Sequence, residues 1–248
     1  MNRHGMIIPV VTVLIIVVLW QLLFLYLDTI ILPAPQSVFM RLLDEMTRES
    51  FWHHLLSSSG RITAGMALAF LLAVPLGLIL GSSARLDRLS APLVYLGYPV
   101  PKIVFLPLIL LIFGLGDLSK IVLIALIVFF QIFIPTRDAV RSIEPELIYA
   151  LQSLGGSRWD YYRHVVWPVA LPGIFTALRI GTGTAVAVLF FVESISARHG
   201  IGFYLIDSWG RADYTAMFVG IIALAIMGIV LYECFDVLEK RVCRWKNV

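Results

Sequence analysis

Ionisable and hydroxyl side chains inside apolar segments are the first candidates for chemistry in this sequence. Lys102, Arg179, Thr182 and Glu193 lie within or at the ends of long apolar runs. A charge in such a run is costly unless a partner or a polar ligand meets it, so it marks a candidate functional site. Lys102 and Arg179 could offer positive charge to an anion, or lie near the cytoplasmic interface and extend their charged ends into it. Glu193 could cap a helix, form an ion pair or act in a gate, and Thr182 could line a pore or bond back to its own helix.

Motifs for catalysis or cofactor binding are absent from the sequence. No Gly-x-x-x-x-Gly-Lys-Ser/Thr loop occurs, so ATP is not bound by that route. The adjacent His53 and His54 point apart on a helix, and no carboxylate or cysteine cluster completes a metal site. No serine–histidine or paired-aspartate arrangement lies within the apolar segments, which argues against an intramembrane hydrolase. We therefore predict a protein that is not an enzyme and has no metal site and no cofactor.

The composition is that of a membrane protein. Of the 248 residues 60% are hydrophobic and 14% are charged, against about a quarter charged in soluble domains. The net charge of +3, without a basic run interleaved with aromatics, excludes nucleic acid as a partner. We expect an all-α integral membrane protein whose principal partner is the lipid bilayer.

Six apolar segments are near the length that spans a bilayer as a helix. They are 6–27, 60–81, 91–113, 118–136, 172–192 and 215–237. The first has no small-residue cleavage pattern and is predicted to be a retained signal-anchor rather than a cleaved signal peptide. In the third, Pro99, Pro101 and Pro107 predict a kinked or broken helix.

Lysine and arginine counts predict the orientation. With the N-terminus inside, the inside segments hold eleven of these residues and the outside segments six. Such an excess marks cytoplasmic segments, so both termini and the loop 137–171 are expected in the cytoplasm. The protein is expected to cross the cell (inner, or cytoplasmic) membrane several times.

The predicted outside segment 28–60 contains Val38, Leu42, Leu43 and Met46 at helical spacing beside charged residues. It predicts an amphipathic helix, either lying at the outer membrane interface or packed on the bundle. Residues 1–56 are thus expected to form a transmembrane helix with an external amphipathic segment.

The loop 144–160 has the pattern of an ordered helix pair. Pro145 suits a first helical turn, and Leu147, Ala150, Leu151 and Leu154 form one apolar stripe. Gly155-Gly156 predicts a helix stop. Ser157, with Asp160 three residues later, predicts a capping box for a second helix that closes before Pro168. Such short helices need packing, either on their own bundle or on a partner.

This loop resembles the EAA loop of ABC-transporter permeases, in which a Glu-Ala-Ala triplet is followed by Gly and later by Ile-x-Leu-Pro. Here the sequence reads Tyr149-Ala150-Leu151, then Gly155, then Val165-Val166-Trp167-Pro168. Further segments, 99–107 and 113–120, resemble the branch that imports nitrate, sulfonates, taurine and bicarbonate. Tyr149 replaces the family's Glu, Leu151 its second Ala and Trp167 its Leu.

The resemblance implies a type I (MetI-like) importer permease core over residues 57–237, with the coupling loop at 137–171 and a cytoplasmic tail at 238–248. It implies a second permease copy, a homodimer in the simplest case, a cytoplasmic ABC ATPase dimer that hydrolyses ATP, and an external solute-binding protein. The loop residues that would dock on the ATPase are Glu146, Leu147, Tyr149, Ala150, Leu151, Leu154, Gly155, Ser157 and Pro168.

The expected function is therefore ATP-driven import of a small solute, with an anion of the nitrate, sulfonate, taurine or bicarbonate type favoured over a vitamin-like heterocycle. An ion-coupled secondary carrier is the alternative from another class. It would carry a polar midplane site and repeated halves, and neither is visible.

Overall fold

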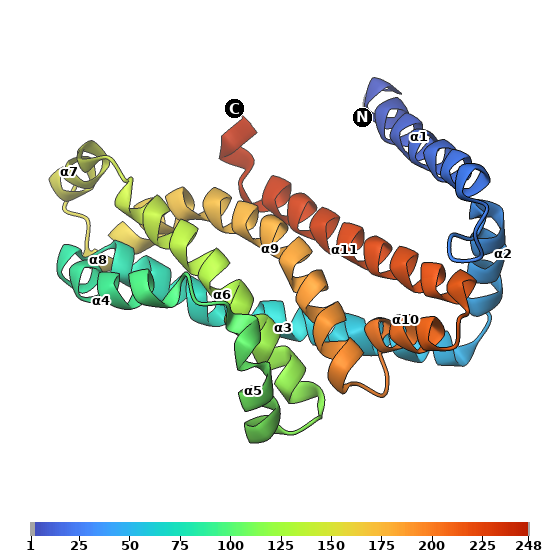
Figure 1. Cartoon of the computed structure of the whole chain (residues 1–248). Coiled ribbons are helices and arrows are strands. Elements are labelled where there is room, and N and C mark those ends of the chain that lie inside the picture. Colours follow the sequence, from blue (N-terminus) through green and yellow to red (C-terminus); the bar gives the residue numbers. More distant parts are fainter. Residues whose placement is uncertain (1–2, 248) are drawn as a thin grey trace.

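The computed structural model describes residues 3–247, and the side chains of residues 10–92 and 94–245. All regular structure in this part of the chain is helical (Figure 1). Five of the described helices are long and apolar enough to cross a membrane, or six if one bent pair counts as a span. The predicted all-helical membrane fold with about six spans is confirmed.

The five long helices each contain one predicted apolar segment. They are α1 (Arg3–Leu27), α3 (Glu49–Gly81), α6 (Asp117–Arg141), α9 (Trp167–Ser196) and α11 (Tyr214–Val242). A bilayer offers no water to the backbone, so each segment must satisfy its amide groups internally, which an α-helix does. The helices extend beyond the predicted segments because polar flanking residues continue the same hydrogen-bond ladder.

The third predicted segment is broken, as its prolines indicated. It forms α4 (Ala84–Gly97), the short 3₁₀ turn η1 (Lys102–Phe105) and α5 (Leu106–Phe113), with a bend of 78° between the two halves. Pro107 lies in the first turn of α5, where its missing N–H needs no partner. The break places Lys102 between the halves.

The centre of the bundle is a close contact between α3 and α6, with α9 on the other side of α6 (Figure 1). Two glycines of α3 permit this approach. A Cβ atom at Gly65 would lie 2.7 Å from Ile124 Cγ2, and one at Gly77 would lie 2.8 Å from Thr136 Cβ. Small residues let membrane helices pack backbone to backbone, where dispersion replaces the hydrophobic effect as the attraction.

Two short helices cover one end of the bundle. The segment predicted to be amphipathic forms α2 (Pro35–Glu45), which packs on α11 with Val38 buried, so this helix lies on the bundle. The second, α10 (Ile201–Gly210), was not predicted from the sequence. Helix α3 runs without interruption through residues 56 and 57, where the sequence suggested a division between parts.

Helix α1 stands apart from the other long helices (Figure 1). It is tied at its C-terminal end, where Trp20 stacks on Phe218 of α11 at 5.4 Å between ring centroids and donates to the Pro33 carbonyl at 3.1 Å. Both α1 and α11 run away from the end that carries α2 and α10. The opposite end carries α7 (Pro145–Ser153) and α8 (Arg158–Tyr161).

Candidate functional site

The glycine stop between α7 and α8 has the predicted geometry. Gly155 adopts φ +73°, its amide donates to the Gln152 carbonyl at 2.9 Å, and the Gly156 amide donates to the Leu151 carbonyl at 3.0 Å. These two bonds form a Schellman motif. A Cβ atom at Gly156 would lie 2.6 Å from Leu151 Cγ. Position 155 therefore needs glycine for its conformation and position 156 for its space.

The predicted capping box at the start of α8 is present. Ser157 Oγ accepts from the Asp160 amide at 3.2 Å, and Asp160 Oδ2 accepts from the Ser157 amide at 2.9 Å. The turn between the two short helices is thus fixed at both of its ends by backbone bonds. The α7–turn–α8 unit, residues 145–161, is called the coupling pair below, after the coupling loop that the resemblance predicts.

The coupling pair turns three side chains toward the bundle, Ile148, Leu151 and Tyr161, and leaves others uncovered. Ile148 and Leu151 are half-buried against the core. Leu147 and Tyr149 are exposed, Leu154 is 86% exposed, and Trp159 of α8 is 71% exposed. The predicted stripe thus divides, because Leu151 faces inward while Leu147, Ala150 and Leu154 remain open to contact from outside.

The second helix of the pair does not close before Pro168, contrary to the prediction. The chain continues through η2 (Tyr162–Val166), a π turn, directly into α9. Here the Trp167 amide donates to the Tyr162 carbonyl, five residues back. Pro168 then lies in the first turn of α9, where a missing N–H is tolerated. The coupling pair is therefore a direct helical extension of a membrane span.

The opposite end of the bundle is organised around the carboxylate of Glu193, which is 0% exposed. Arg61 Nη1 donates to Glu193 Oε1 at 2.6 Å, and Ser58 Oγ lies within 2.9 Å of both carboxylate oxygens. The Gly202 amide donates to Oε2 at 2.9 Å. The geometry shows the ion pair that was one of the expectations for Glu193, and it joins α3, α9 and α10.

Two further bonds extend this Glu193 network. Arg61 donates from Nη1 to the His199 carbonyl at 2.6 Å and from Nε to Asp117 Oδ1 of α6 at 2.8 Å. Gly200 passes so close that a Cβ atom there would lie 2.4 Å from Glu193 Cδ. Arg61 was not singled out from the sequence. Arg61 begins the predicted span 60–81, and Glu193 follows the end of the predicted span 172–192. Opposite charges at the same side of two spans were the signal that could have indicated this ion pair.

Arg179, Thr182 and Lys102 do not converge on one point. Arg179 Nη1 donates to Asp236 Oδ1 at 2.6 Å and Nη2 lies 2.8 Å from Glu239 Oε2, which ties α9 to α11. Thr182 Oγ1 bonds back to the Leu178 carbonyl at 3.0 Å, the second of its two expected roles. Lys102 donates to the Tyr98 carbonyl, and its ammonium lies 4.3 Å from the centroid of the Phe130 ring.

Lys102 thereby stands beside a cavity of about 540 Å³ between α4, α6 and α9. The residues that line this cavity are Tyr98, Phe130, Gln131, Ile134, Pro135, Pro172, Gly173, Thr176, Ala177 and Ile180. Tyr98 and Phe130 thus link the lysine to the cavity wall. Cationic, hydroxyl and amide groups beside a largely apolar wall could accompany a small anion without holding it tightly.

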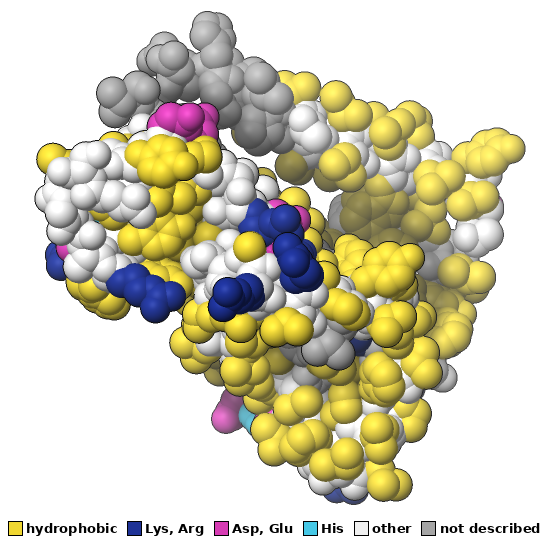
Figure 2. Space-filling model, turned by 90° about the vertical axis from the view of Figure 1, so that its left-hand side faces the viewer, with side chains coloured by type: hydrophobic (Ala, Val, Ile, Leu, Met, Phe, Trp, Pro, Cys, Tyr) yellow, Lys and Arg dark blue, Asp and Glu magenta, His cyan; other side chains and the backbone are white. Residues whose placement is uncertain are grey.

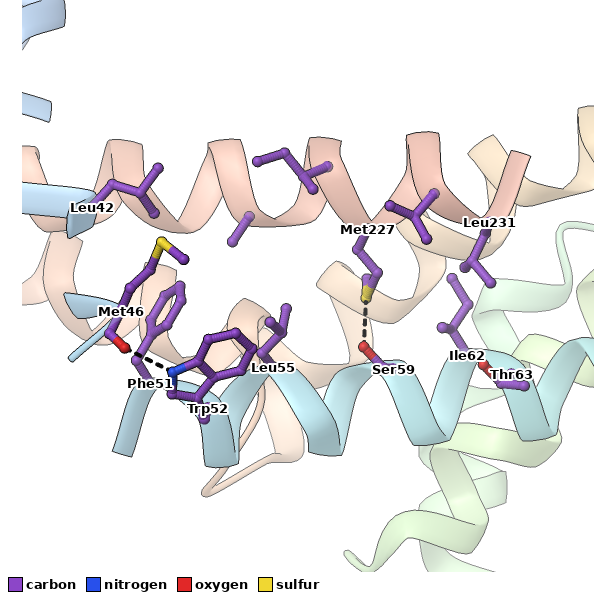
Figure 3. A pocket seen from close by; sticks show the side chains of 13 residues that line it. Leu42, Met46, Phe51, Trp52, Leu55, Ser59, Ile62, Thr63, Met227 and Leu231 are labelled. Atoms are coloured by element: carbon purple, nitrogen blue, oxygen red, sulfur yellow. Dashed lines mark hydrogen bonds between the residues drawn. The ribbon is translucent and has the colours of Figure 1, made fainter. Parts of the chain in front are cut away.

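A second pocket, of about 370 Å³, lies between α3 and α11 next to the end of α2 (Figure 3). Met46, Phe51, Trp52, Leu55 and Ile62 point into it, and none of its lining side chains is charged. Its polar contacts are internal, such as the bond from Ser59 Oγ to Met227 Sδ at 3.6 Å. This pocket offers nothing to recognise an anion.

The histidines at the end that carries α10 do not form a metal centre. The rings of His53 and His54 are 6.5 Å apart, and His199 approaches the His53 ring at 4.6 Å. The Gly200 amide donates to His54 Nδ1 at 3.0 Å, which occupies that nitrogen. Among the described residues no group of His, Cys, Asp or Glu side chains has a geometry that could hold a metal ion.

Five or six candidate spans, buried charge pairs between them and an ordered helix pair at one end describe a polytopic membrane protein. Residues 73–244 match the family of binding-protein-dependent transport system inner membrane components. The chain belongs to this family. It is a permease subunit of an ABC importer and not itself an enzyme, and it works in the inner membrane with an ATPase and a binding protein.

Individual relatives agree with this assignment. The chain is 35% identical over 225 residues to the taurine transport system permease protein TauC of Escherichia coli K12, with 88% of this chain and 82% of TauC covered. It is 32% identical to the riboflavin transport system permease protein RibX of Chloroflexus aurantiacus, covering 95% and 89%. The putative aliphatic sulfonates permease SsuC of Bacillus subtilis is 26% identical, covering 99% and 90%.

A solved structure has the same fold. Inward-facing MetNI, the methionine ABC transporter, matches with a TM-score of 0.65 at 20% identity, covering 76% of this chain and 94% of that one. The predicted MetI-like core is thereby confirmed.

The Glu193 network gives a direct stability prediction. We expect Glu193→Gln to destabilise the protein by about 3–5 kcal/mol, because Arg61 then remains buried with only the exposed Asp117 as counter-charge. Thermal unfolding of the purified protein in detergent measures the change. Glu233→Gln, at an exposed carboxylate on α11, is the control and should leave the melting temperature unchanged. Equal melting temperatures for the two variants would contradict the central role of the network.

Proposed function

We propose that two copies of this chain form the translocation path of an ATP-driven importer for a small organic anion of the sulfonate or taurine type. In this proposal the coupling pair docks on the cytoplasmic ATPase, and an external binding protein delivers the solute. Closure of the ATPase dimer by ATP moves the two coupling pairs together and switches the bundle between inward and outward access, a two-state element biased by a ligand bound elsewhere.

The observation that carries the coupling role is the exposure of apolar side chains on a rigid unit. Leu147, Tyr149, Leu154 and Trp159 are exposed, while the backbone beneath them is fixed by the Schellman motif and the capping box. Apolar side chains held outward on an ordered polar loop favour contact with a protein partner. Tyr149, in place of the family's Glu, would contribute apolar area to that contact.

The direct helical link from α8 through the π turn into α9 supports transmission of the movement. Because no loop interrupts residues 158–196, displacement of the coupling pair moves a membrane helix. Gly155 would act as the pivot between α7 and α8. Pro168 lies in the first turn of α9, outside the coupling pair. It would therefore support docking through the position of α9 rather than by contact with the ATPase.

The proposal also includes an orientation in the membrane and a second copy of the chain. The excess of Lys and Arg around 85–88, 137–163 and 240–246 supports a cytoplasmic coupling pair and cytoplasmic termini. The cavity beside Lys102 supplies one wall of a path, and the second copy would supply the other. Arg179 and Glu193 are better suited to hold helices together, because carboxylate or guanidinium partners already occupy them.

The substrate class rests on relatives and on Lys102. Permeases named for taurine and for aliphatic sulfonates are both similar to the chain, and a lysine beside the cavity suits an anion. A vitamin-like heterocycle is the second candidate, because relatives named for riboflavin and formylaminopyrimidine also match over most of the chain.

Reconstitution tests the function directly. The chain, its ATPase and its binding protein are placed in proteoliposomes, and uptake of radiolabelled taurine is followed with and without ATP. We expect uptake only when ATP and all three proteins are present. Uptake that continues without ATP or without the ATPase would contradict the importer. Stimulation of hydrolysis by riboflavin rather than taurine would instead support the heterocycle.

The pivot is tested by a conformational series at position 155. We expect Gly155→Val to lose most uptake while ATP hydrolysis continues, because a β-branched residue opposes the positive φ of the stop. Gly155→Asn should retain more uptake, since Asn adopts the left-handed conformation more readily. A Cβ atom at position 155 meets nothing within 4 Å, so steric overlap does not confound the comparison. Equal uptake for the two variants would argue against the pivot.

A further inference from the structure

A polar cavity of about 530 Å³ lies at the inner end, between the membrane helices and the coupling pair. Its floor comes from the end of α3 and the start of α4, and one wall from the end of α6. Ile148 of α7 and Tyr161 of α8 close the remaining side. The lining residues are Gly81, Ser82, Ala84, Asp87, Arg88, Ala91, Arg137, Val140, Arg141, Ile143, Ile148 and Tyr161.

This cavity carries more positive than negative charge. Three arginines line it, Arg88, Arg137 and Arg141, against the single carboxylate of Asp87. Asp87 is buried and accepts from Arg137 Nε and from Arg141 Nη1. Two guanidinium groups thus share one carboxylate, and the lining keeps an excess of two positive charges.

Donors remain for a further anion. Each guanidinium has five N–H groups, and one from Arg137 and one from Arg141 reach Asp87. Arg137 also lies 3.7 Å from Oδ1 of the exposed Asp138, beyond hydrogen-bond distance. Arg88 makes no ion pair with any side chain that the structure describes. The N-terminus of α4, capped by Ser83, adds its partial positive charge at the floor.

The surface at this end of the molecule also shows the excess of positive charge. Figure 2 shows basic side chains gathered between hydrophobic ones on the face that carries α4, α7 and α8. Leu86 and Leu89 of α4 are exposed beside Arg88, so the cavity lies next to a surface suited to the apolar part of the bilayer. Both a lipid headgroup and a soluble anion can therefore reach it.

We propose that this basic cavity binds a tetrahedral oxyanion with net negative charge, either the phosphate group of an anionic inner-leaflet lipid or a soluble phosphate ion; the phosphate of phosphatidylcholine is already balanced by its own choline. Fork-shaped guanidinium groups match such an anion with paired hydrogen bonds. The bound anion offsets the repulsion between Arg137 and Arg141 and joins α4 to α6. Because Ile148 and Tyr161 form a wall of the same cavity, occupancy steadies the coupling pair against the bundle.

The test uses the permease–ATPase complex in nanodiscs of phosphatidylcholine. One arm adds phosphatidylglycerol, and the other titrates inorganic phosphate against chloride at equal ionic strength. The readouts are the melting temperature of the complex and the lipid retained in native mass spectrometry. Arg88→Gln removes a lining cation, and Arg85→Gln is the matched control, three residues earlier on α4 and outside the cavity lining.

We expect phosphatidylglycerol or phosphate to raise the melting temperature of the wild-type complex. Arg88→Gln should weaken the apparent affinity about tenfold, the loss of one charged hydrogen-bonding group, and Arg85→Gln by less. A response to the lipid alone identifies a headgroup, and a response to phosphate in pure phosphatidylcholine identifies a soluble ion. No stabilisation by either, or equal weakening in the two variants, would overturn the site.

Discussion

Hydrocarbon accepts a charged side chain only where an opposite charge or other polar or aromatic groups meet it, and this constraint determines how the helices of the chain are joined. Three pairings satisfy it. Arg61 meets Glu193 at the end that carries α10, Arg179 meets Asp236 and Glu239 between α9 and α11, and Asp87 meets Arg137 at the end that carries α7 and α8. Each pairing joins helices that are distant in sequence. Lipid gives no hydrophobic attraction between helices, so these pairings and the close α3–α6 contact fix their relative positions.

The two ends of the bundle use this constraint differently. At the end that carries α10 the Glu193 carboxylate is enclosed by Ser58, Arg61 and the Gly202 amide, so that end is closed over a fully paired charge. At the end that carries α7 and α8 the Asp87 carboxylate is shared by two arginines and lies beside an open cavity, while the coupling pair leaves large apolar side chains uncovered. This difference agrees with the proposal that the moving contact of the subunit is at the α7–α8 end.

Local sequence patterns predicted the long helices and the α7–α8 pair, but not α10, the π turn or the contacts between helices. Length and hydropathy predicted the spans, the prolines near Lys102 predicted the break, and Gly155 and Ser157 predicted the stop and the cap. The proline, glycine and serine patterns concern only neighbouring residues, so they predict local structure and not contacts between distant segments. The ion pair between Arg61 and Glu193 joins positions 132 residues apart. The sequence places both residues near ends of predicted spans, but it does not show which of several such charged residues pair. The π turn before Pro168 was missed because proline usually marks the end of a helix. Here the hydrogen bond from the Trp167 amide spans five residues instead of four, and the helix continues through Pro168.

The contact between the coupling pair and the ATPase is the claim on which the proposed mechanism depends, and site-specific cross-linking tests it most directly. A Leu154→Cys variant is made in a Cys234→Ser background, which removes the exposed native thiol. Leu115→Cys, also exposed but in the loop between α5 and α6, is the control. In membranes that contain the ATPase, the cysteine at 154 should cross-link to it, with a yield that changes on addition of ATP, and the cysteine at 115 should not. Absence of any cross-link from position 154, or an equal yield from position 115, would contradict docking through this helix pair.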